Sequence, residues 1–256
     1  MNEYDVIIAG AGVNGLACAS LLVKEGLSVC VVEKNAWIGG GAVTRELTLP
    51  GFKHDQFGSS HVWVHINRDF KELLEPELVK FGLDYIYQND HITGHPDRNG
   101  GPGVVVYKDI DKTCESIAQY SKSDAKRYRE IFDDFHLIKD GVVKNFFSPP
   151  QPPSTMARAM ETSHEGLARL QEFSLSARAW VDYNFENDFI KAVMLNWALA
   201  PQILPDQEGA GQSFYVMIPS IHEFGQAVPR GGSQMLPNSM RAYIESEGST
   251  VLTEAT

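Results

Sequence analysis

Several features that define common classes of protein are absent from this sequence of 256 residues. Only Cys18, Cys30 and Cys114 occur and none forms a C-x-x-C pair, which excludes a disulphide framework, a cysteine-based zinc site and dithiol redox chemistry. No run of residues is long and apolar enough to span a bilayer. Basic residues do not cluster, and the formal net charge of −11 argues against nucleic acid as a partner.

The start of the sequence carries no recognisable targeting segment. Met1 to Asp5 is acidic and leads directly into an apolar segment, whereas signal and transit peptides have basic starts. Together with the few cysteines, this predicts a soluble protein of a reducing compartment, the cytoplasm.

Residues 4–44 organise the rest of the chain. The pattern predicts a strand over 5–9, a glycine turn over 10–15, and a helix over 16–24 that Gly26 stops. A second strand over 27–32 then ends on Glu33. This order is a βαβ unit containing the G-x-G-x-x-G fingerprint, which is typical of dinucleotide-binding domains.

Each glycine of the turn has a predicted role. Gly10 permits a tight exit from the strand, Gly12 lets backbone N–H groups approach a pyrophosphate, and Gly15 lets the helix pack close to the sheet. The N-terminus of the helix offers unpaired N–H groups to the phosphates. The carboxylate of Glu33 is placed to accept hydrogen bonds from ribose hydroxyls, and it would repel a 2′-phosphate.

A second glycine cluster at Gly39-Gly40-Gly41 follows the acid, and it suits a ligand that continues past the first strand, as FAD does. Here the sequence resembles the glutathione-reductase-like FAD flavoproteins. Within them it is most similar to the carotenoid (phytoene) desaturase-like group, which includes pyridine nucleotide-disulphide oxidoreductase domain-containing protein 2. The resemblance rests on the glycine turn, Glu33, the 39–44 run, Pro50-Gly51-Phe52, His54-Asp55, Gly58-Ser59-Ser60 and residues 228–233.

The resemblance implies an α/β fold: a Rossmann-like FAD-binding domain with an inserted α+β substrate domain. Residues 1–70 would start the FAD-binding domain, residues 71–221 would form part of the substrate domain, and residues 222–256 would return to the FAD-binding domain. The C-terminal part of such flavoproteins is absent from the sequence. The implied FAD-binding residues are Gly10, Ala11, Gly12, Val13, Asn14, Gly15, Glu33, Lys34, Gly39, Gly40, Gly41, Ala42, Val43 and Thr44.

Other elements are predicted from periodicity and capping residues. We expect an amphipathic helix over 68–81 interrupted by Pro76, and a hairpin formed by strands 84–87 and 103–107. Further helices are expected over 109–140 with a cap at Ser123-Asp124, and over 164–175, 177–199 and 235–247, followed by a strand from 250. Residues 214–218 fit either a strand or a helix. The Phe- and Pro-rich segment 146–153 is a surface loop or, alternatively, an apolar lip that rests on a membrane surface.

The implied function is dehydrogenation or saturation of an apolar, isoprenoid- or carotenoid-like substrate by hydride transfer to or from flavin. Three alternatives stay open: an amine-oxidase-like flavoenzyme, a non-catalytic fragment or half of a split enzyme, and a site for NAD instead of FAD. Removing the rest of the fold should expose sheet edge and apolar surface, so we expect a homo-oligomer or a complementary C-terminal half as partner.

The sequence assigns no catalytic residue and no metal site. His54, His61 and His65 lie close together in the sequence. His61 and His65, at i and i+4, could face the same way on a helix, but no third ligand stands at a recognisable metal-binding spacing. His61 is either an acid or base near the flavin or a histidine that hydrogen-bonds within the fold. Arg45 either stabilises a reduced flavin or pairs with a surface carboxylate.

Overall fold

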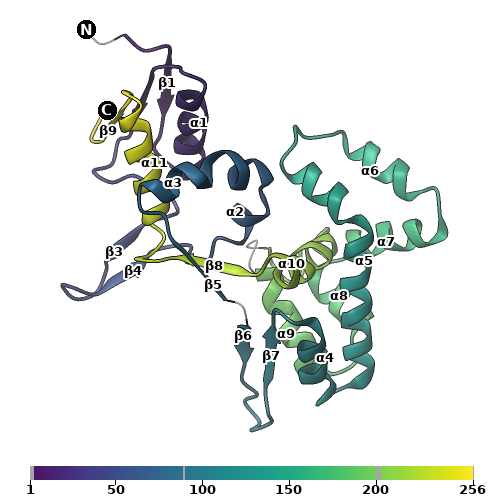
Figure 1. The fold of residues 1–256 in the computed structure, drawn as a ribbon. Coiled ribbons are helices and arrows are strands. Elements are labelled where there is room, and N and C mark those ends of the chain that lie inside the picture. The colour runs from purple at the N-terminus through teal and green to yellow at the C-terminus, as the bar shows by residue number, and fades with distance from the viewer. Residues whose placement is uncertain (1–2, 89, 200–202, 256) are drawn as a thin grey trace. The chain divides into compact units, whose positions relative to one another are not determined.

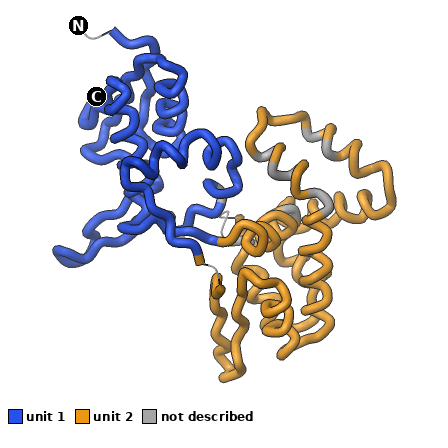
Figure 2. Tube along the Cα trace, in the orientation of Figure 1, with its two compact units in different colours: residues 1–87, 226–256 blue, residues 88–225 orange. Residues whose placement is uncertain are grey.

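The computed structural model describes residues 3–88, 90–199 and 203–255. They form two compact units, residues 1–87 with 226–256 and residues 88–225 (Figure 2). The sequence predicted these divisions after residues 70 and 221. The first unit instead continues to residue 87 and resumes at residue 226, where strand β5 (Tyr85–Gln88) pairs with β8 (Gln226–Pro229). That the second unit binds a substrate stays a prediction.

A three-stranded parallel sheet forms the centre of the first unit (Figure 1). Its order is β1 (Val6–Ala9), β2 (Val29–Val32) and β9 (Thr250–Leu252). Helix α1 (Val13–Lys24) connects β1 to β2, and α11 (Met235–Ser246) precedes β9. Side chains of the sheet and of both helices share one buried apolar cluster. This is the βαβ arrangement that the sequence predicted.

The remaining elements of this unit lie between β2 and β5. They are the antiparallel pair β3 (Thr44–Glu46) and β4 (Lys53–Asp55), helix α2 (Val62–Ile66), the π-helix η1 (Phe70–Leu74) and α3 (Glu75–Lys80). The predicted interruption at Pro76 is found, because the helical stretch changes from η1 to α3 at residue 75. Pro76 lies in the first turn of α3, a position that proline tolerates.

The second unit combines one hairpin with helices. Its elements are β6 (His91–His95), β7 (Val104–Tyr107), α4 (Ile110–Ala118), α5 (Lys122–Phe146), α6 (Pro153–Met160), α7 (His164–Ser174), α8 (Ala177–Asn184), α9 (Asp188–Leu199) and α10 (Gly211–Phe224). The predicted pairing of strands 84–87 and 103–107 was wrong, because β7 pairs with β6. The sequence of β6, His-Ile-Thr-Gly-His, carries too little apolar alternation to be recognised as a strand.

Two helix boundaries of this unit differ from the prediction, and one open alternative is decided. Ser121, not Ser123, caps α5 by accepting the N–H of Asp124 (3.0 Å). The predicted helix 177–199 is two helices, because the Asp124 carboxylate accepts the N–H groups of Glu186 and Asn187 (2.8 and 3.0 Å) and holds the chain in a turn there. Residues 214–218 lie inside α10.

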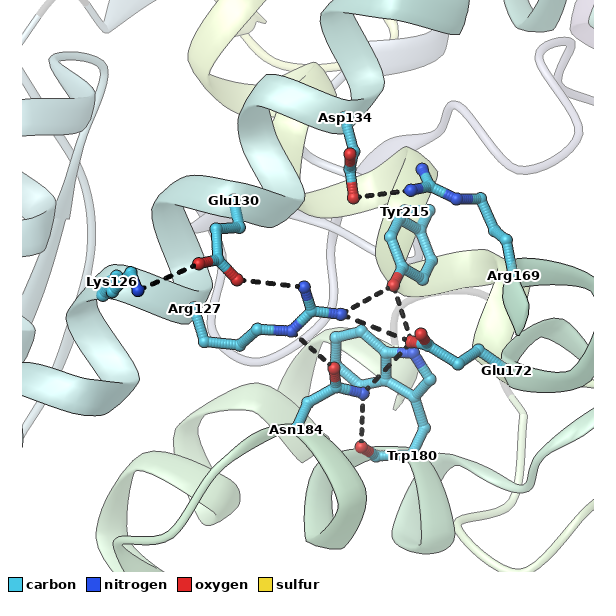
Figure 3. A network of polar contacts seen from close by, with 9 residues as sticks. All are labelled: Lys126, Arg127, Glu130, Asp134, Arg169, Glu172, Trp180, Asn184 and Tyr215. Carbon is cyan, nitrogen blue, oxygen red and sulfur yellow. Dashed lines mark hydrogen bonds and ion pairs between the residues drawn. The ribbon is translucent and has the colours of Figure 1, made fainter. Parts of the chain in front are cut away.

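A polar network joins four helices of this unit around Arg127 of α5 (Figure 3). The Arg127 guanidinium donates to the side chains of Asn184 (2.7 Å) and Tyr215 (3.0 Å), and it pairs with Glu172 at 3.5 Å. The Tyr215 hydroxyl donates to Glu172 (2.6 Å). Since Glu172 is on α7, Asn184 on α8 and Tyr215 on α10, one guanidinium fixes these helices to α5.

Aromatic packing supports the network from the core. Trp180 stacks on Phe214, with ring centroids 4.1 Å apart and an interplanar angle of 3°. Other apolar side chains of α8, α9 and the segment between them are buried in the same core: Val181, Phe185, Val193, Met194 and Trp197. The apolar lip was predicted from Phe146 and Phe147: the side chain of Phe146 lies outside the described part of the structure, and Phe147 is exposed. Within the described ranges, no helix has both the length and the apolar character needed to cross a bilayer.

Candidate nucleotide-binding site

The glycine turn connects the end of β1 to the start of α1. Gly10 has φ +98°, a conformation that favours glycine, and its N–H donates to the carbonyl of Val32 (2.7 Å). Helix α1 begins at Val13, earlier than predicted, and no side chain caps it. Its first N–H groups lack intrahelical partners, so they are available to an anionic ligand.

Gly15 and Gly12 have opposite surroundings. A Cβ on Gly15 would lie 2.3 Å from the carbonyl oxygen of Gly10, and only glycine, which has no Cβ, avoids this clash. The close approach of helix and strand at Gly15 therefore agrees with its predicted role. Around Gly12, no atom lies within 4 Å of the position that a Cβ would take. The fold does not require glycine at this position, and its backbone is open to a ligand.

The carboxylate of Glu33 ties the end of β2 to the glycine turn. Oε2 accepts the N–H of Ala11 (2.9 Å), and Oε1 accepts the backbone N–H and the side-chain amide of Asn35 (both 2.8 Å). Burial raises the pKa of Glu33, but these hydrogen bonds outweigh it and hold the pKa below its usual value. Three of about four acceptor positions are used, which leaves one for a ribose hydroxyl. Lys34 is exposed beside it.

The second glycine cluster packs directly against the first. The N–H of Gly39 donates to the carbonyl of Ala11 (2.7 Å), and Gly12 and Gly39 form an isolated parallel bridge. A Cβ on Gly40 would lie 3.2 Å from the Cα of Gly12. Gly41 differs from its neighbours, since no atom lies within 4 Å of its Cβ position. The cluster thus places an open backbone segment beside the turn.

Both glycine segments line one pocket of about 420 Å³. Its walls are Gly12, Val13, Asn14, Gly41, Ala42, Gly58, His61, Val64 and Leu236. All of these residues belong to the first unit. Five predicted cofactor-binding residues therefore meet at one surface, and the segment around Gly58 extends it. The other predicted residues form the turn and the strand ends behind that surface.

A polar network that sequence reasoning missed continues from this pocket. The Asp55 carboxylate accepts the hydroxyl of Thr44 (2.6 Å) and the N–H of Ser233 (2.9 Å). The Ser233 hydroxyl lies 3.1 Å from Nε2 of His61, and Nδ1 of His61 lies 3.0 Å from the hydroxyl of Tyr85. These residues are far apart in sequence, and only the loop between β8 and α11 brings Ser233 to the others.

The partners of His61 fix its tautomer. The Ser233 hydroxyl also contacts the carbonyl of Gly58, which can only accept, so the hydroxyl donates there and accepts from Nε2–H of His61. Nδ1 is then the acceptor for the hydroxyl of Tyr85. Burial lowers the pKa of His61, and the nearby Asp55 only partly opposes this shift. His61 is therefore a neutral imidazole at the pocket wall, hydrogen-bonded within the fold.

His65 lies one helical turn further on and also packs on Tyr85, with ring centroids 4.4 Å apart. Its Nδ1 lies 3.2 Å from the hydroxyl of Tyr87, which also accepts from Lys71 (3.1 Å). Within the described residues, Nε2 of His65 has no hydrogen-bond partner. Burial, with the positive charge of Lys71, lowers the pKa of His65 to about 4.

The other candidates from the sequence lie apart from these contacts. Arg45 is exposed and its guanidinium covers the ring of Trp37 at 4.1 Å, a cation–π contact and not a carboxylate pair. His54 lies within hydrogen-bonding distance of Thr48 (2.9 Å) in the exposed β3–β4 hairpin. Across the described residues, no group of three or more His, Cys, Asp or Glu is arranged to hold a metal ion.

Comparisons with known proteins agree with this geometry. Residues 8–75 match the NAD(P)-binding Rossmann-like domain family. A limonene dehydrogenase subunit of Castellaniella defragrans is 25% identical over 94% of this chain and 43% of its own length. Pyridine nucleotide-disulfide oxidoreductase domain-containing protein 2 of Mus musculus is 25% identical over 99% of this chain and 48% of its own length. The chain thus spans about half the length of these relatives.

Solved structures show the same fold. A putrescine oxidase triple mutant matches with a TM-score of 0.60 at 18% identity, over 99% of this chain and 51% of that one. Cyclohexylamine oxidase from Brevibacterium oxydans matches with a TM-score of 0.58 at 19% identity, over the same shares. The chain is therefore a mixed α/β protein with a Rossmann-like nucleotide-binding domain. It is homologous to pyridine nucleotide-disulfide oxidoreductase domain-containing protein 2, as the resemblance predicted, and also to the limonene dehydrogenase subunit.

Proposed function

We propose that this chain binds FAD through the ADP half of the cofactor and forms part of a flavin-dependent oxidoreductase that acts on an apolar substrate. The observation that carries the proposal is that two glycine segments line one pocket. Gly12 and Gly41 both have open space where a Cβ would stand, so a ligand can reach the backbone of either segment. NAD uses the first segment alone, whereas FAD continues past it.

Each residue of the site has a role that follows from its contacts. The first N–H groups of α1 would hold the pyrophosphate, and the free acceptor position of Glu33 would hold a ribose hydroxyl. Gly41 and Ala42 would support the part of the cofactor beyond the pyrophosphate. FAD, when bound, supplies the hydride-transfer chemistry. His61, neutral and already hydrogen-bonded on both nitrogens, orients Ser233 and Tyr85 and transfers no proton in this arrangement.

The proposed apolar substrate class is supported by the names of two relatives. Limonene, named in one relative, is a terpene, and digeranylgeranylglycerophospholipid reductase of Methanosphaerula palustris, 30% identical over 32% of this chain, is named for an isoprenoid lipid. We therefore propose an isoprenoid-like substrate.

The amine-oxidase alternative has weaker support. A flavin-containing amine oxidase of Rattus norvegicus is 29% identical over 48% of this chain. That alternative predicts aromatic side chains beside the flavin, but among the described lining residues only His61 carries an aromatic ring. The other rival is a non-catalytic fragment or one half of a split enzyme. Cofactor binding separates these hypotheses.

The test compares four ligands on the purified chain: FAD, ADP, NAD and FMN. Because the proposed site holds the ADP half, we expect ADP and FAD to bind and FMN not to bind. FAD should bind more tightly than ADP or NAD, because only FAD reaches the second glycine segment. Calorimetry and the flavin absorbance band are the measurements. A chain that shows no flavin absorbance and binds neither FAD nor ADP would refute the proposal and favour a non-catalytic fragment.

Two pairs of variants locate the ligand. Glu33→Arg should abolish binding of ADP and FAD, whereas Glu25→Arg makes the same charge change at the exposed end of α1 and should not. Gly41→Val should weaken FAD by at least about tenfold, or 1.4 kcal/mol, and leave ADP unchanged. Gly94→Val, an equally open position in β6, is its control. Equal binding of NAD and FAD would support the NAD alternative.

A further inference from the structure

Two consecutive residues that directly precede α11, Ser233 and Gln234, contact the second glycine segment, defined here as residues 39–44. The side-chain amide of Gln234 donates to the carbonyl of Ile38 (3.1 Å), directly before the segment. Its backbone N–H donates to the hydroxyl of Thr44 (3.0 Å), at the end of the segment. One residue, at least 190 positions away in the chain, therefore holds both ends of the segment.

The hydroxyl of Thr44 connects Gln234 to Ser233. It accepts from Gln234 and donates to the Asp55 carboxylate (2.6 Å), so its one hydrogen is used within the fold. The same carboxylate oxygen accepts the N–H of Ser233 (2.9 Å). Thr44 is therefore fixed from two directions, by the residue before α11 and by the end of β4.

Ser233 extends these contacts to the wall of the pocket. It is fully buried, its hydroxyl donates to the carbonyl of Gly58, and the same hydroxyl accepts from Nε2 of His61 (3.1 Å). The N–H of Gly58 donates to the carbonyl of Gly41 (3.5 Å). Hydrogen bonds therefore run from Ser233 through Gly58 to Gly41. The last two of these residues line the pocket.

Two glycines permit this close approach of the chain segments. Gly232 has φ +99°, and a Cβ there would lie 3.0 Å from the Asp55 carboxylate and nearer still to the side chain of Thr44. Gly39 has φ +111°, and a Cβ there would lie 2.9 Å from the ring of Pro237 in α11. The start of α11 is thus joined to the second glycine segment by packing as well as by hydrogen bonds.

The composition of the second glycine segment makes such contacts important. It begins with three consecutive glycines, and glycine loses more conformational freedom on folding than any other residue. A ligand that binds to a segment already fixed does not have to order it, whereas ordering a loose segment on binding costs affinity. The contacts of Ser233 and Gln234 therefore affect the affinity for any ligand that the segment supports.

The glycine turn is held by different residues. The N–H of Gly10 donates to the carbonyl of Val32 (2.7 Å), and the N–H of Ala11 donates to the carboxylate of Glu33 (2.9 Å). Both acceptors lie at the end of β2, far from the residues before α11 in the chain. The two parts of the proposed FAD site can therefore be perturbed separately.

We propose that Ser233 and Gln234 are positioning residues for FAD, because they fix residues 39–44 where the cofactor extends beyond its ADP half. They act on the cofactor through this segment. The inference rests on the proposed function and goes beyond it, since it assigns the preference for FAD over ADP to two residues outside both glycine clusters. Loss of their contacts should weaken FAD binding and leave ADP binding unchanged.

The test measures the binding of FAD and of ADP by calorimetry for variants of the purified chain. Gln234→Glu keeps the size of the side chain but places a carboxylate oxygen against the carbonyl of Ile38. Thr44→Val keeps the shape of the side chain and removes its hydroxyl. In both variants the Kd for FAD should rise at least about tenfold, while the Kd for ADP changes by less than about twofold. Thr44→Ser keeps the hydroxyl and should bind both ligands like the wild type.

Ser233→Ala tests the contact to Gly58 and should weaken FAD in the same selective way. Because Ser233 is fully buried, thermal unfolding establishes first that this variant is folded. If it does not fold, Gln234→Glu, at a partly exposed position, still decides the question. Thr48→Val and Gln88→Glu are the controls, since they make the same chemical changes at exposed positions outside the segment. Both should bind FAD and ADP normally.

Hydrogen–deuterium exchange without ligand tests the segment itself. The N–H of Ala42 donates to the carbonyl of Gly39 (2.9 Å), so it should be protected in the wild type. In Gln234→Glu and Thr44→Val, its exchange should be at least about tenfold faster, because the segment opens more often. The N–H of Ala11, which donates to Glu33, should exchange at the wild-type rate.

The outcomes separate this inference from the proposed function. A wild-type chain that binds FAD, with variants that keep its ratio of FAD to ADP affinity, would overturn the inference and leave the proposed function standing. Equal losses of FAD and ADP affinity would also overturn it, because they would indicate general damage to the fold. Unchanged exchange at Ala42 would contradict the fixing of the segment. A wild-type chain that binds neither ligand would refute the proposed function, and with it the role of Ser233 and Gln234 toward FAD.

Discussion

The contrast between Gly15 and Gly12 gives a sharp test of the site, because one glycine is needed by the fold and the other only by the ligand. In Gly15→Ala, the new Cβ would lie 2.3 Å from the carbonyl oxygen of Gly10, about 0.7 Å inside the 3.0 Å below which Cβ contacts essentially never occur. That oxygen belongs to the backbone of the turn, so it cannot swing away as a flexible side chain would. The helix and the strand must separate instead.

The size of the effect follows from two opposing contributions. Overpacking of this kind costs about 1–3 kcal/mol, and replacing glycine by alanine within a helix returns about 1 kcal/mol. Because the clash is with backbone, its cost lies at the upper end of this range, about 3 kcal/mol, and the net loss in the free energy of unfolding of Gly15→Ala is about 2 kcal/mol. The Tm should fall by about 4–8 °C for a chain of this length. Thermal unfolding followed by circular dichroism measures both.

Gly12→Ala should behave in the opposite way. Its φ of −70° and ψ of 168° suit alanine, and no atom lies within 4 Å of the added methyl group. Less freedom in the unfolded chain stabilises this variant by about 0.5 kcal/mol, and the poorer helix cap cancels that gain. Stability should stay unchanged while ADP binding falls by at least about tenfold, because the methyl group occupies the approach of the pyrophosphate. If Gly12→Ala binds ADP normally, or if Gly15→Ala is fully stable, the reasoning fails.

Two further predictions concern titration and the helical unit. The pKa of His65 falls from 6.5 to about 4 on folding, so the unfolded chain gains a proton first as the pH drops. Between pH 6.5 and 4 the chain should therefore lose roughly 3 kcal/mol of its free energy of unfolding. The variant His65→Phe should show a smaller fall of Tm over this pH range. An unchanged fall of Tm would contradict the lowered pKa of His65. In the second unit, Tyr215→Phe should cost about 1 kcal/mol, because Arg127 still pairs with Glu172. Arg127→Leu leaves the largely buried Glu172 without its cation and should lower the free energy of unfolding, measured in urea, by about 3 kcal/mol. If Arg127→Leu and Tyr215→Phe lowered it equally, the guanidinium would not organise the network.

The nucleotide site was largely predictable because its determinants are local. The turn, α1 and the two strands follow one another within 33 residues, and each is specified by glycines or by apolar periodicity. Even there, α1 begins at Val13 instead of Leu16, because apolar periodicity does not mark a helix start that lacks a capping side chain. The sequence predicted that Glu33 contacts a ribose, but not that its carboxylate accepts the N–H of Ala11, because this hydrogen bond depends on the folded turn.

Contacts between distant segments could not be predicted from one sequence. Ser233 reaches His61 and Asp55 across more than 170 residues, and nothing in its own neighbourhood indicates this. The pairing of β5 with β8 likewise spans the whole inserted unit. The break at residues 185–187 results from Asp124, more than 60 residues away, whose carboxylate outweighs the local preference for helix.

The hydrogen bond from Ala11 to Glu33 has a consequence for how such chains change over time. An acid at the end of the second strand is commonly taken as a mark of ribose recognition, yet here it also braces the turn. A descendant that no longer needed its cofactor would still be under selection to keep Glu33 and Gly15, because its folding would depend on both. Gly12 and Gly41, at which no contact of the fold requires glycine, would drift first. If the proposed site holds the cofactor, the residues at positions 12 and 41 are therefore better records of continued cofactor use among descendants of this chain than Glu33 and Gly15.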